Sequence, residues 1–197
     1  MNIANKLTLL RIFMIPIFLI FLLPNKIPFL ANLIDNSGAG MVSLFSWIAL
    51  AIFVLASVTD FFDGYIARKY NMISNFGKFM DPLADKLLVC SALIGLMALD
   101  KLNIWFVLIV IARDFIISGF RLVAAERGVV IAAAMSGKIK TALQMVMIGC
   151  LIPVIELPFY SVFLIVFEII VLILTIYSLL EYIIKNRTVL SDAVSKK

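Results

Sequence analysis

The chain has 197 residues, of which 64% are hydrophobic and only 15% are charged, and its formal net charge is +5. Soluble domains are roughly half apolar and about a quarter charged, so this composition indicates a membrane protein. The apolar runs are long and continuous instead of alternating, which excludes a β-barrel and leaves helices to cross the bilayer. One span needs about 20 residues, so the length suits about six helices and no separate soluble domain.

Apolar runs predict six membrane-spanning helices, at residues 8–24, 42–62, 80–99, 103–123, 139–156 and 160–184. The expected fold class is therefore all-α, a polytopic membrane protein with a six-transmembrane-helix bundle that forms one domain over residues 1–197. Residues 1–8 interleave polar and apolar side chains and are predicted to form a short N-terminal interfacial segment. Residues 31–41 are predicted to form an outer loop.

Lysine and arginine residues are concentrated at one side of these predicted spans. The other side holds only Lys26 and Lys101, beside Asp35, Asp100 and Glu156. This asymmetry follows the positive-inside rule, so both termini and the active site are expected on the cytoplasmic side of the cell membrane. The positive charge then indicates anionic lipid headgroups and phosphorylated substrates as partners, and no nucleic acid.

Four aspartates, Asp60, Asp63, Asp81 and Asp85, lie within 26 residues of one another. The first two are three residues apart and the last two are four apart, so each pair shares one face of a helix. The chain has no histidine, and the few nearby bases cannot pair with all four acids. Carboxylates that converge near a bilayer favour a hard divalent cation, so the cluster predicts a metal site. A helix cap at Asp81 and a turn at Asp63 are alternative interpretations, but neither explains both pairs.

Between the two acid pairs lie small and basic residues that suit a diphosphate group. Gly64 allows a ligand to approach the backbone closely, and Ala67 adds little bulk. Arg68 offers a fork of hydrogen-bond donors, and Gly77 suits close packing or a phosphate site lined by backbone.

The complete pattern, Asp60-x2-Asp63-Gly64-x2-Ala67-Arg68-x8-Gly77-x3-Asp81-x3-Asp85, resembles the signature of the CDP-alcohol phosphotransferases at every fixed position. The segments NIANKLTLLRI, ARDFIISGFRLVAAERG and SGKIKT are similar to the phosphatidylglycerophosphate synthase branch of that family. One departure is Ala4, where proline is expected in that branch.

The resemblance implies a homodimeric membrane enzyme that transfers a phosphatidyl group from CDP-diacylglycerol to an alcohol and releases CMP. It implies Mg²⁺ or Mn²⁺ as the cofactor, expected as two divalent ions, and glycerol 3-phosphate as the acceptor. Asp60, Asp63 and Asp81 would be metal ligands, and Asp85 would be the catalytic base with a further metal contact. The CDP-binding residues would be Asp60, Asp63, Gly64, Ala67, Arg68 and Gly77.

A second polar constellation lies further along the chain. Arg113 and Arg121 belong to the fourth predicted span, and Lys138 and Lys140 begin the fifth. Together these four cations predict a basic pocket for an acceptor that carries a phosphate, which fits glycerol 3-phosphate. The alternatives are topogenic charges, or ion pairs of Arg113 with Asp114 or with the acidic cluster. Adjacent helical residues do not face each other, so we expect Arg113 and Asp114 each to have other partners.

Other functions compatible with these patterns remain as alternatives. A related enzyme could take serine, inositol phosphate or phosphatidylglycerol as its acceptor, and only the basic pocket separates these choices. A divalent-cation transporter would need an acidic pathway that continues across the membrane, and no such pathway is evident. A purely structural membrane subunit would leave the acid cluster unexplained.

Overall fold

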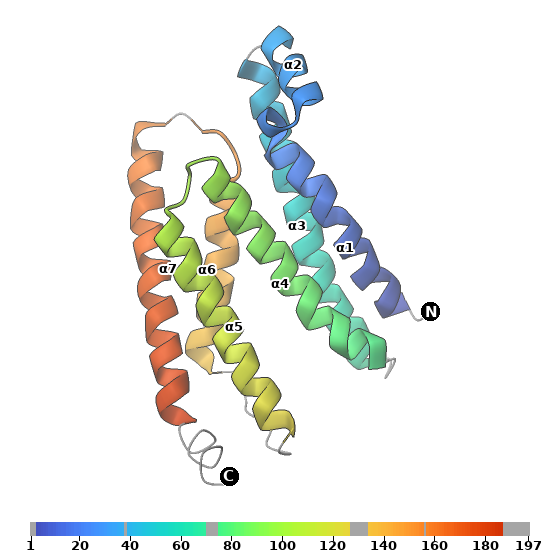
Figure 1. Ribbon diagram of the computed structural model, residues 1–197, viewed down its shortest axis with the longest axis vertical. Helices are drawn as coiled ribbons and strands as arrows, with labels where there is room; N and C mark the ends of the chain where they lie inside the picture. Colours follow the sequence, from blue (N-terminus) through green and yellow to red (C-terminus); the bar gives the residue numbers. More distant parts are fainter. Residues whose placement is uncertain (1–2, 38, 70–74, 127–133, 156, 187–197) are drawn as a thin grey trace. The chain divides into compact units, whose positions relative to one another are not determined.

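The computed structural model describes residues 3–37, 39–69, 75–126, 134–155 and 157–186. Within these ranges it describes only the backbone of residues 3–7, 36–37, 39, 60–69, 75–82, 85, 126 and 158. The described chain is helical and contains no strand, which confirms the all-α prediction. Its elements are α1 (Ile3–Leu22), the 3₁₀ turn η1 (Pro24–Lys26), α2 (Pro28–Ser37), α3 (Ala39–Lys69), α4 (Asn75–Ala98), α5 (Ile104–Glu126), α6 (Met135–Leu151) and α7 (Pro158–Lys185) (Figure 1).

Each of the six predicted spans overlaps one of these helices, although the ends differ: the span predicted at 139–156 runs past the end of α6 at Leu151. Two segments in the described chain are long and apolar enough to cross a membrane by themselves, Gly40–Thr59 and Phe159–Lys185. Shorter apolar helical segments are Thr8–Leu22 and Lys86–Ala98. Only 17% of the most apolar window of α7 is buried inside the protein, so most of its apolar surface faces outward. Such a surface is unfavourable in water and indicates contact with lipid.

Two sequence predictions about the first part of the chain need correction. The predicted loop over residues 31–41 is wrong, because α2 covers Pro28–Ser37 and α3 begins at Ala39. Pro28 occupies the first position of α2, where its fixed φ and missing N–H favour a helix start, and Ile34 is buried. In addition, α1 continues unbroken from Ile3, so the described part of the interfacial segment belongs to the same helix as the first predicted span.

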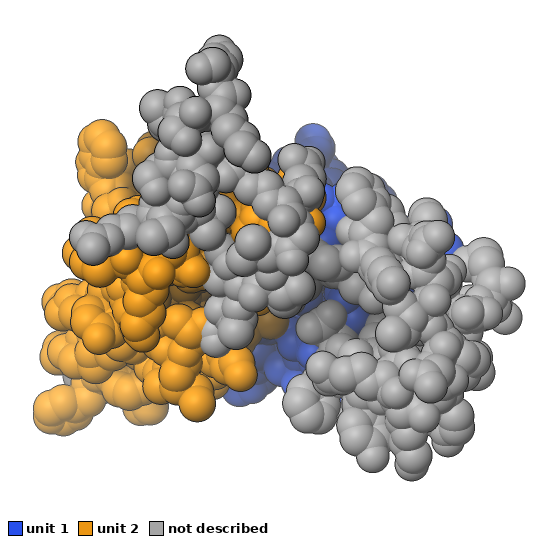
Figure 2. All heavy atoms as spheres, turned by 90° about the horizontal axis from the view of Figure 1, so that it is seen from below, with its two compact units in different colours: residues 1–102, 148–156 blue, residues 103–147, 157–197 orange. Residues whose placement is uncertain are grey.

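The described residues form two compact units, coloured separately in Figure 2. Unit 1 comprises residues 1–102 and 148–156, and therefore contains α1–α4 and the end of α6. Unit 2 comprises residues 103–147 and 157–197, and contains α5, most of α6 and α7.

In unit 1, α1 packs against both α3 and α4. The rings of Phe18 and Phe53 are 5.8 Å apart, and those of Phe21 and Phe45 are 5.7 Å apart, so α1 and α3 run antiparallel. On α4, a Cβ added to Gly95 would lie 2.5 Å from Cδ2 of Leu22. The glycine therefore permits the close approach of α1 and α4. The residues that α1 buries are Thr8, Arg11, Ile15, Phe18 and Leu22.

Within unit 1, Lys101 joins the connection that follows α4 to the residues at and just after the end of α6. The Nζ atom of Lys101 donates hydrogen bonds to the carbonyl oxygens of Leu151, Ile152 and Pro153, at 2.7, 3.1 and 3.3 Å. These carbonyls lie at the C-terminal end of α6, where a cation is favourable. Burial lowers the pKa of Lys101, and the three carbonyl oxygens oppose that shift because they accept bonds from the ammonium.

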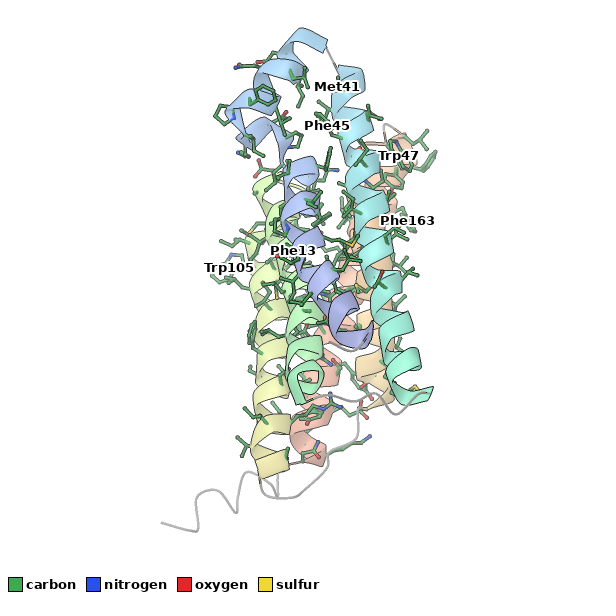
Figure 3. All side chains as sticks on the ribbon, turned by 90° about the vertical axis from the view of Figure 1, so that its right-hand side faces the viewer. Phe13, Met41, Phe45, Trp47, Trp105 and Phe163 are labelled. Atoms are coloured by element: carbon green, nitrogen blue, oxygen red, sulfur yellow. The ribbon has the colours of Figure 1, made fainter. Side chains whose placement is uncertain are left out.

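In unit 2, α5 packs against α7. Asn103 caps the first turn of α5, since its Oδ1 accepts a hydrogen bond of 2.8 Å from the backbone N–H of Trp105. The backbone of Asn103 is also hydrogen-bonded to Glu168 on α7. Glu168 therefore joins two helices, which the sequence alone did not indicate. The large aromatic side chains of Trp105 on α5 and Phe163 on α7 are exposed (Figure 3).

Candidate active site

The motif aspartates lie on two consecutive helices that pack against each other in unit 1. Asp60 and Asp63 belong to the last third of α3, and Asp81 and Asp85 belong to the first half of α4. The predicted helical spacing of both pairs is therefore confirmed for the backbone. The side chains of these four residues lie outside the described part of the structure, and their role as metal ligands stays a prediction.

The helix boundaries exclude the two alternative interpretations of single aspartates. Helix α4 begins at Asn75, six residues before Asp81, so Asp81 is not an N-cap. Helix α3 continues beyond Asp63 to Lys69, so Asp63 is not a turn residue. Hydropathy placed the end of this span at residue 62 because polar residues follow, but a helix can continue through polar residues.

The other four motif positions also lie on these helices. Gly64, Ala67 and Arg68 are in the last turns of α3, and Gly77 is in the first turn of α4. Among the side chains that the structure does describe, no three His, Cys, Asp or Glu residues come together as metal ligands. The motif aspartates thus remain the candidates for a metal site.

Unit 2 contains a buried ionic cluster centred on Asp114. Arg113 on α5 is 7% exposed, and its Nη1 donates to Oδ1 of Asp114 at 2.9 Å. Lys140 on α6 is fully buried, and its Nζ donates to the same oxygen at 2.8 Å. Arg113 also donates from Nε and Nη2 to Oγ of Ser178 on α7, at 3.1 and 3.0 Å. Three helices therefore meet at this cluster.

Among the side chains that the structure describes, this cluster holds two cations and one carboxylate. Two cations share one carboxylate, which leaves a net charge of +1 among Arg113, Asp114 and Lys140. Because both cations bind one oxygen, they lie within about 6 Å of each other and would repel by roughly 3 kcal/mol at an effective dielectric constant of 20. Asp114 offsets this repulsion.

The structure brings together two of the four predicted acceptor-binding cations. Arg113 and Lys140 converge on Asp114, whereas Arg121 and Lys138 are exposed. None of the ion pairs seen among described residues joins either exposed cation to Asp114. The expectation that Arg113 and Asp114 have separate partners is confirmed by Ser178 and Lys140, but the two adjacent residues also pair directly.

Small and polar residues of this cluster had no assigned role in the sequence. A Cβ at Gly137 would lie 3.0 Å from Nη2 of Arg113, so glycine leaves room for the guanidinium. Ser178 accepts hydrogen bonds from Arg113 and donates one to the carbonyl oxygen of Thr175 at 3.0 Å. A second contact between α6 and α7 joins Ser136 to Glu181. Ser178 stands alone in an apolar run, which gives no sequence signal, so only the structure identifies it.

These features define a class: an all-helical membrane protein with paired acids on two packed helices and a buried cluster in which two cations pair with one aspartate. The profile of the CDP-alcohol phosphatidyltransferase family matches residues 1–177. The chain belongs to this family, as its motif predicted.

Individual relatives give the comparison more detail. A protein of Bacillus subtilis (strain 168) named CDP-diacylglycerol–glycerol-3-phosphate 3-phosphatidyltransferase is 46% identical over 151 residues, which cover 77% of this chain and 76% of that protein. A protein of the same name from Rickettsia felis is 41% identical over 151 residues, covering 77% and 75%. A Mycobacterium tuberculosis (strain ATCC 25618 / H37Rv) protein named "Probable phosphatidylglycerophosphate synthase" is 43% identical over 148 residues, covering 75% and 64%.

Proposed function

We propose that this protein transfers a phosphatidyl group from CDP-diacylglycerol to glycerol 3-phosphate, which gives phosphatidylglycerophosphate and CMP in anionic phospholipid biosynthesis. The placement of all eight motif residues on the packed helices α3 and α4 carries this proposal. The names of the relatives from Bacillus subtilis and Rickettsia felis support the choice of both substrates.

In the proposed site, Asp60, Asp63, Asp81 and Asp85 hold the divalent ions, which we expect to be two Mg²⁺ or Mn²⁺. The donor set fits such ions because it is made of carboxylate oxygens, and the chain has no histidine. Bound divalent ions would neutralise the diphosphate of the donor and stabilise the departing CMP. Asp85 also accepts the proton of the attacking hydroxyl group, because a carboxylate is the available base.

The remaining motif residues bind the CDP moiety of the donor. Gly64, Ala67 and Gly77 leave space for it along α3 and α4, and Arg68 donates hydrogen bonds to its phosphates.

The acceptor phosphate is assigned to the basic residues of unit 2. The convergence of the cations Arg113 and Lys140 on one carboxylate supports this assignment, and the exposed Arg121 and Lys138 add further charge in the same unit. A serine acceptor has no phosphate, so it would not need this cluster.

We further propose that residues 1–197 form one multi-pass domain in the cell membrane, with six spans, cytoplasmic termini and a cytoplasmic active site. The distribution of lysine and arginine and the match of each predicted span with a helix support this topology. The functional unit is proposed to be a homodimer, in line with the family resemblance.

An acceptor panel tests the proposed reaction. Purified protein is incubated with CDP-diacylglycerol, Mg²⁺ and one acceptor at a time: glycerol 3-phosphate, serine, inositol phosphate or phosphatidylglycerol. CMP release and the lipid product are measured. We expect turnover with glycerol 3-phosphate alone, and a preference for another acceptor would contradict the proposal. Absence of CMP release with every acceptor would leave a cation transporter to be tested by ion flux.

Acid variants test the assigned roles. Replacing Asp60, Asp63 or Asp81 with alanine is expected to nearly abolish CMP release, and EDTA should do the same to the unaltered enzyme. Asp85→Asn at saturating Mg²⁺ should keep substrate binding but lose turnover, because an amide cannot accept the proton. Activity that persists in EDTA would rule out the metal site.

A further inference from the structure

Arg11 on α1 is 1% exposed and is among the most deeply buried side chains of unit 1. Because arginine remains protonated in proteins, its burial is unfavourable unless acceptors surround the charge. Helix α1 contains no acidic residue and packs against α3 and α4. The carboxylates on those two helices are the motif residues Asp60, Asp63, Asp81 and Asp85.

The packing of α1 on α3 places Arg11 at the level of one of these acids. Phe18 of α1 contacts Phe53 of α3, and the two helices run antiparallel. Arg11 lies seven residues before Phe18, and Asp60 lies seven residues after Phe53. Seven residues make about two helical turns, which returns to the same helix face. Arg11 and Asp60 therefore lie in register along the backbones of α1 and α3.

The packing of α1 on α4 leads independently to the same region. Leu22 of α1 contacts Gly95 of α4, and both helices run in the same direction in unit 1 (Figure 1). Thr8 lies fourteen residues before Leu22, and Asp81 lies fourteen residues before Gly95. Fourteen residues make about four turns, so Thr8 and Asp81 lie in register. Thr8 is also only 1% exposed. The two buried polar residues of α1, Thr8 and Arg11, thus lie level with an acid on α4 and an acid on α3, respectively.

We propose that Arg11 is a positioning residue of the acidic site, which orients the Asp60 carboxylate for metal binding and balances its charge. The inference rests on the proposed function, because it deepens the metal site assigned there. Arg11 acts through the carboxylate and not by substrate contact, since a side chain with 1% exposure is enclosed by helices. Outer partners that orient metal ligands are a general requirement of such sites.

The first test measures binding of Mn²⁺ alone, without substrates. Mn²⁺ is titrated into detergent-purified protein, and the free ion is followed by electron paramagnetic resonance. Arg11→Gln should weaken Mn²⁺ binding roughly ten- to hundredfold, the usual effect of losing an outer partner of a metal ligand. Arg11→Lys keeps the charge but loses the planar fork of donors. The Mn²⁺ affinity of this variant should therefore lie between that of the unaltered protein and that of Arg11→Gln. The matched control is Lys26→Gln, an exposed basic residue, which should bind Mn²⁺ as the unaltered protein does.

The second test is a double-mutant cycle on thermal unfolding in EDTA. Arg11→Gln should lower the melting temperature, because the acids lose a neighbouring cation. Asp60→Asn removes the partner of Arg11 but also relieves repulsion among the acids, so the sign of its own shift is not part of the prediction. The shift of the double variant should be less negative than the sum of the two single shifts, which is the signature of a direct coupling. If Arg11→Gln does not fold, the cycle is run with Arg11→Lys.

Unchanged or tighter Mn²⁺ binding in Arg11→Gln would overturn the proposal, because Arg11 would then only compete with the metal. Additive shifts in melting temperature would overturn it as well. Neither readout uses phosphatidyl transfer, so an unaltered protein that fails the acceptor panel would refute the proposed function without deciding the role of Arg11.

Discussion

Replacing Asp114 with asparagine keeps the size of the side chain but removes the negative charge that Arg113 and Lys140 share. The two cations would then repel each other across about 6 Å, by roughly 3 kcal/mol at an effective dielectric constant of 20. Arg113 would retain its hydrogen bonds to Ser178, whereas Lys140 would lose the charge-assisted bond of 2.8 Å that it donates to Asp114.

The expected cost follows from burial. Removing one partner of a buried ion pair costs about 3–5 kcal/mol. Water reaches Asp114, whose side chain is 24% exposed, so we expect a loss near the lower limit, about 3 kcal/mol. Thermal or denaturant unfolding in detergent micelles measures this loss. Asp35→Asn on α2 is the matched control. Asp35 is exposed, so this variant should unfold like the unaltered protein.

The same variant tests the acceptor assignment. If Asp114 holds Arg113 and Lys140 in place for the acceptor phosphate, the KM for glycerol 3-phosphate should rise about tenfold, equivalent to roughly 1.4 kcal/mol. The KM for CDP-diacylglycerol should change much less, because other residues bind the donor. A lower KM for glycerol 3-phosphate would refute the reasoning, since it would mean that Asp114 mainly repels the phosphate.

Three further predictions concern the fold and its orientation. Lys101→Met removes three hydrogen bonds from an ammonium group and should lower the free energy of unfolding by about 2–3 kcal/mol. Chemical unfolding in micelles measures this, and an unchanged value would contradict a stabilising role for these three bonds. Gly95→Val should lower the melting temperature, because even a Cβ would overlap Leu22, whereas Gly40→Ala, where nothing lies within 4 Å, should not. Single cysteines at positions 36 and 70, in a chain without its native cysteines, should react with an impermeant thiol reagent from the outer and the cytoplasmic side respectively; labelling of both from one side would contradict the six-span topology.

Hydropathy was sufficient to locate the six principal helices but not their ends. It identifies the residues that suit the bilayer core, whereas a helix ends where its backbone hydrogen bonding ends. For this reason α3 extends through Asp63 and Arg68 to Lys69, past the predicted boundary. The same limitation concealed α2, whose polar residues resemble a loop although Pro28 starts a helix and Ile34 is buried.

The acid pairs could be predicted because their chemistry depends on spacing within a single helix. The roles of Asp114 and Arg11 depend on neighbours from other helices, which a single sequence does not reveal. Asp114 meets Lys140 at a sequence separation of 26, and Arg113 meets Ser178 at a separation of 65. Arg11 resembles a topogenic charge in the sequence, and only the packing of Phe18 on Phe53 places it in register with Asp60.

The two charged regions differ in the kind of ligand that each can hold. The ends of α3 and α4 carry four aspartates, and the buried guanidinium of Arg11 balances at most one of them. The described side chains of the cluster at Asp114 have the opposite ratio, with two buried cations for one carboxylate. An excess of acid requires added cations, and an excess of base requires an added anion. A cation transporter would need only the first of these. Transfer of a metal-bound phosphatidyl group to an acceptor that carries its own phosphate needs both, so the basic cluster is the feature that favours glycerol 3-phosphate over a neutral alcohol.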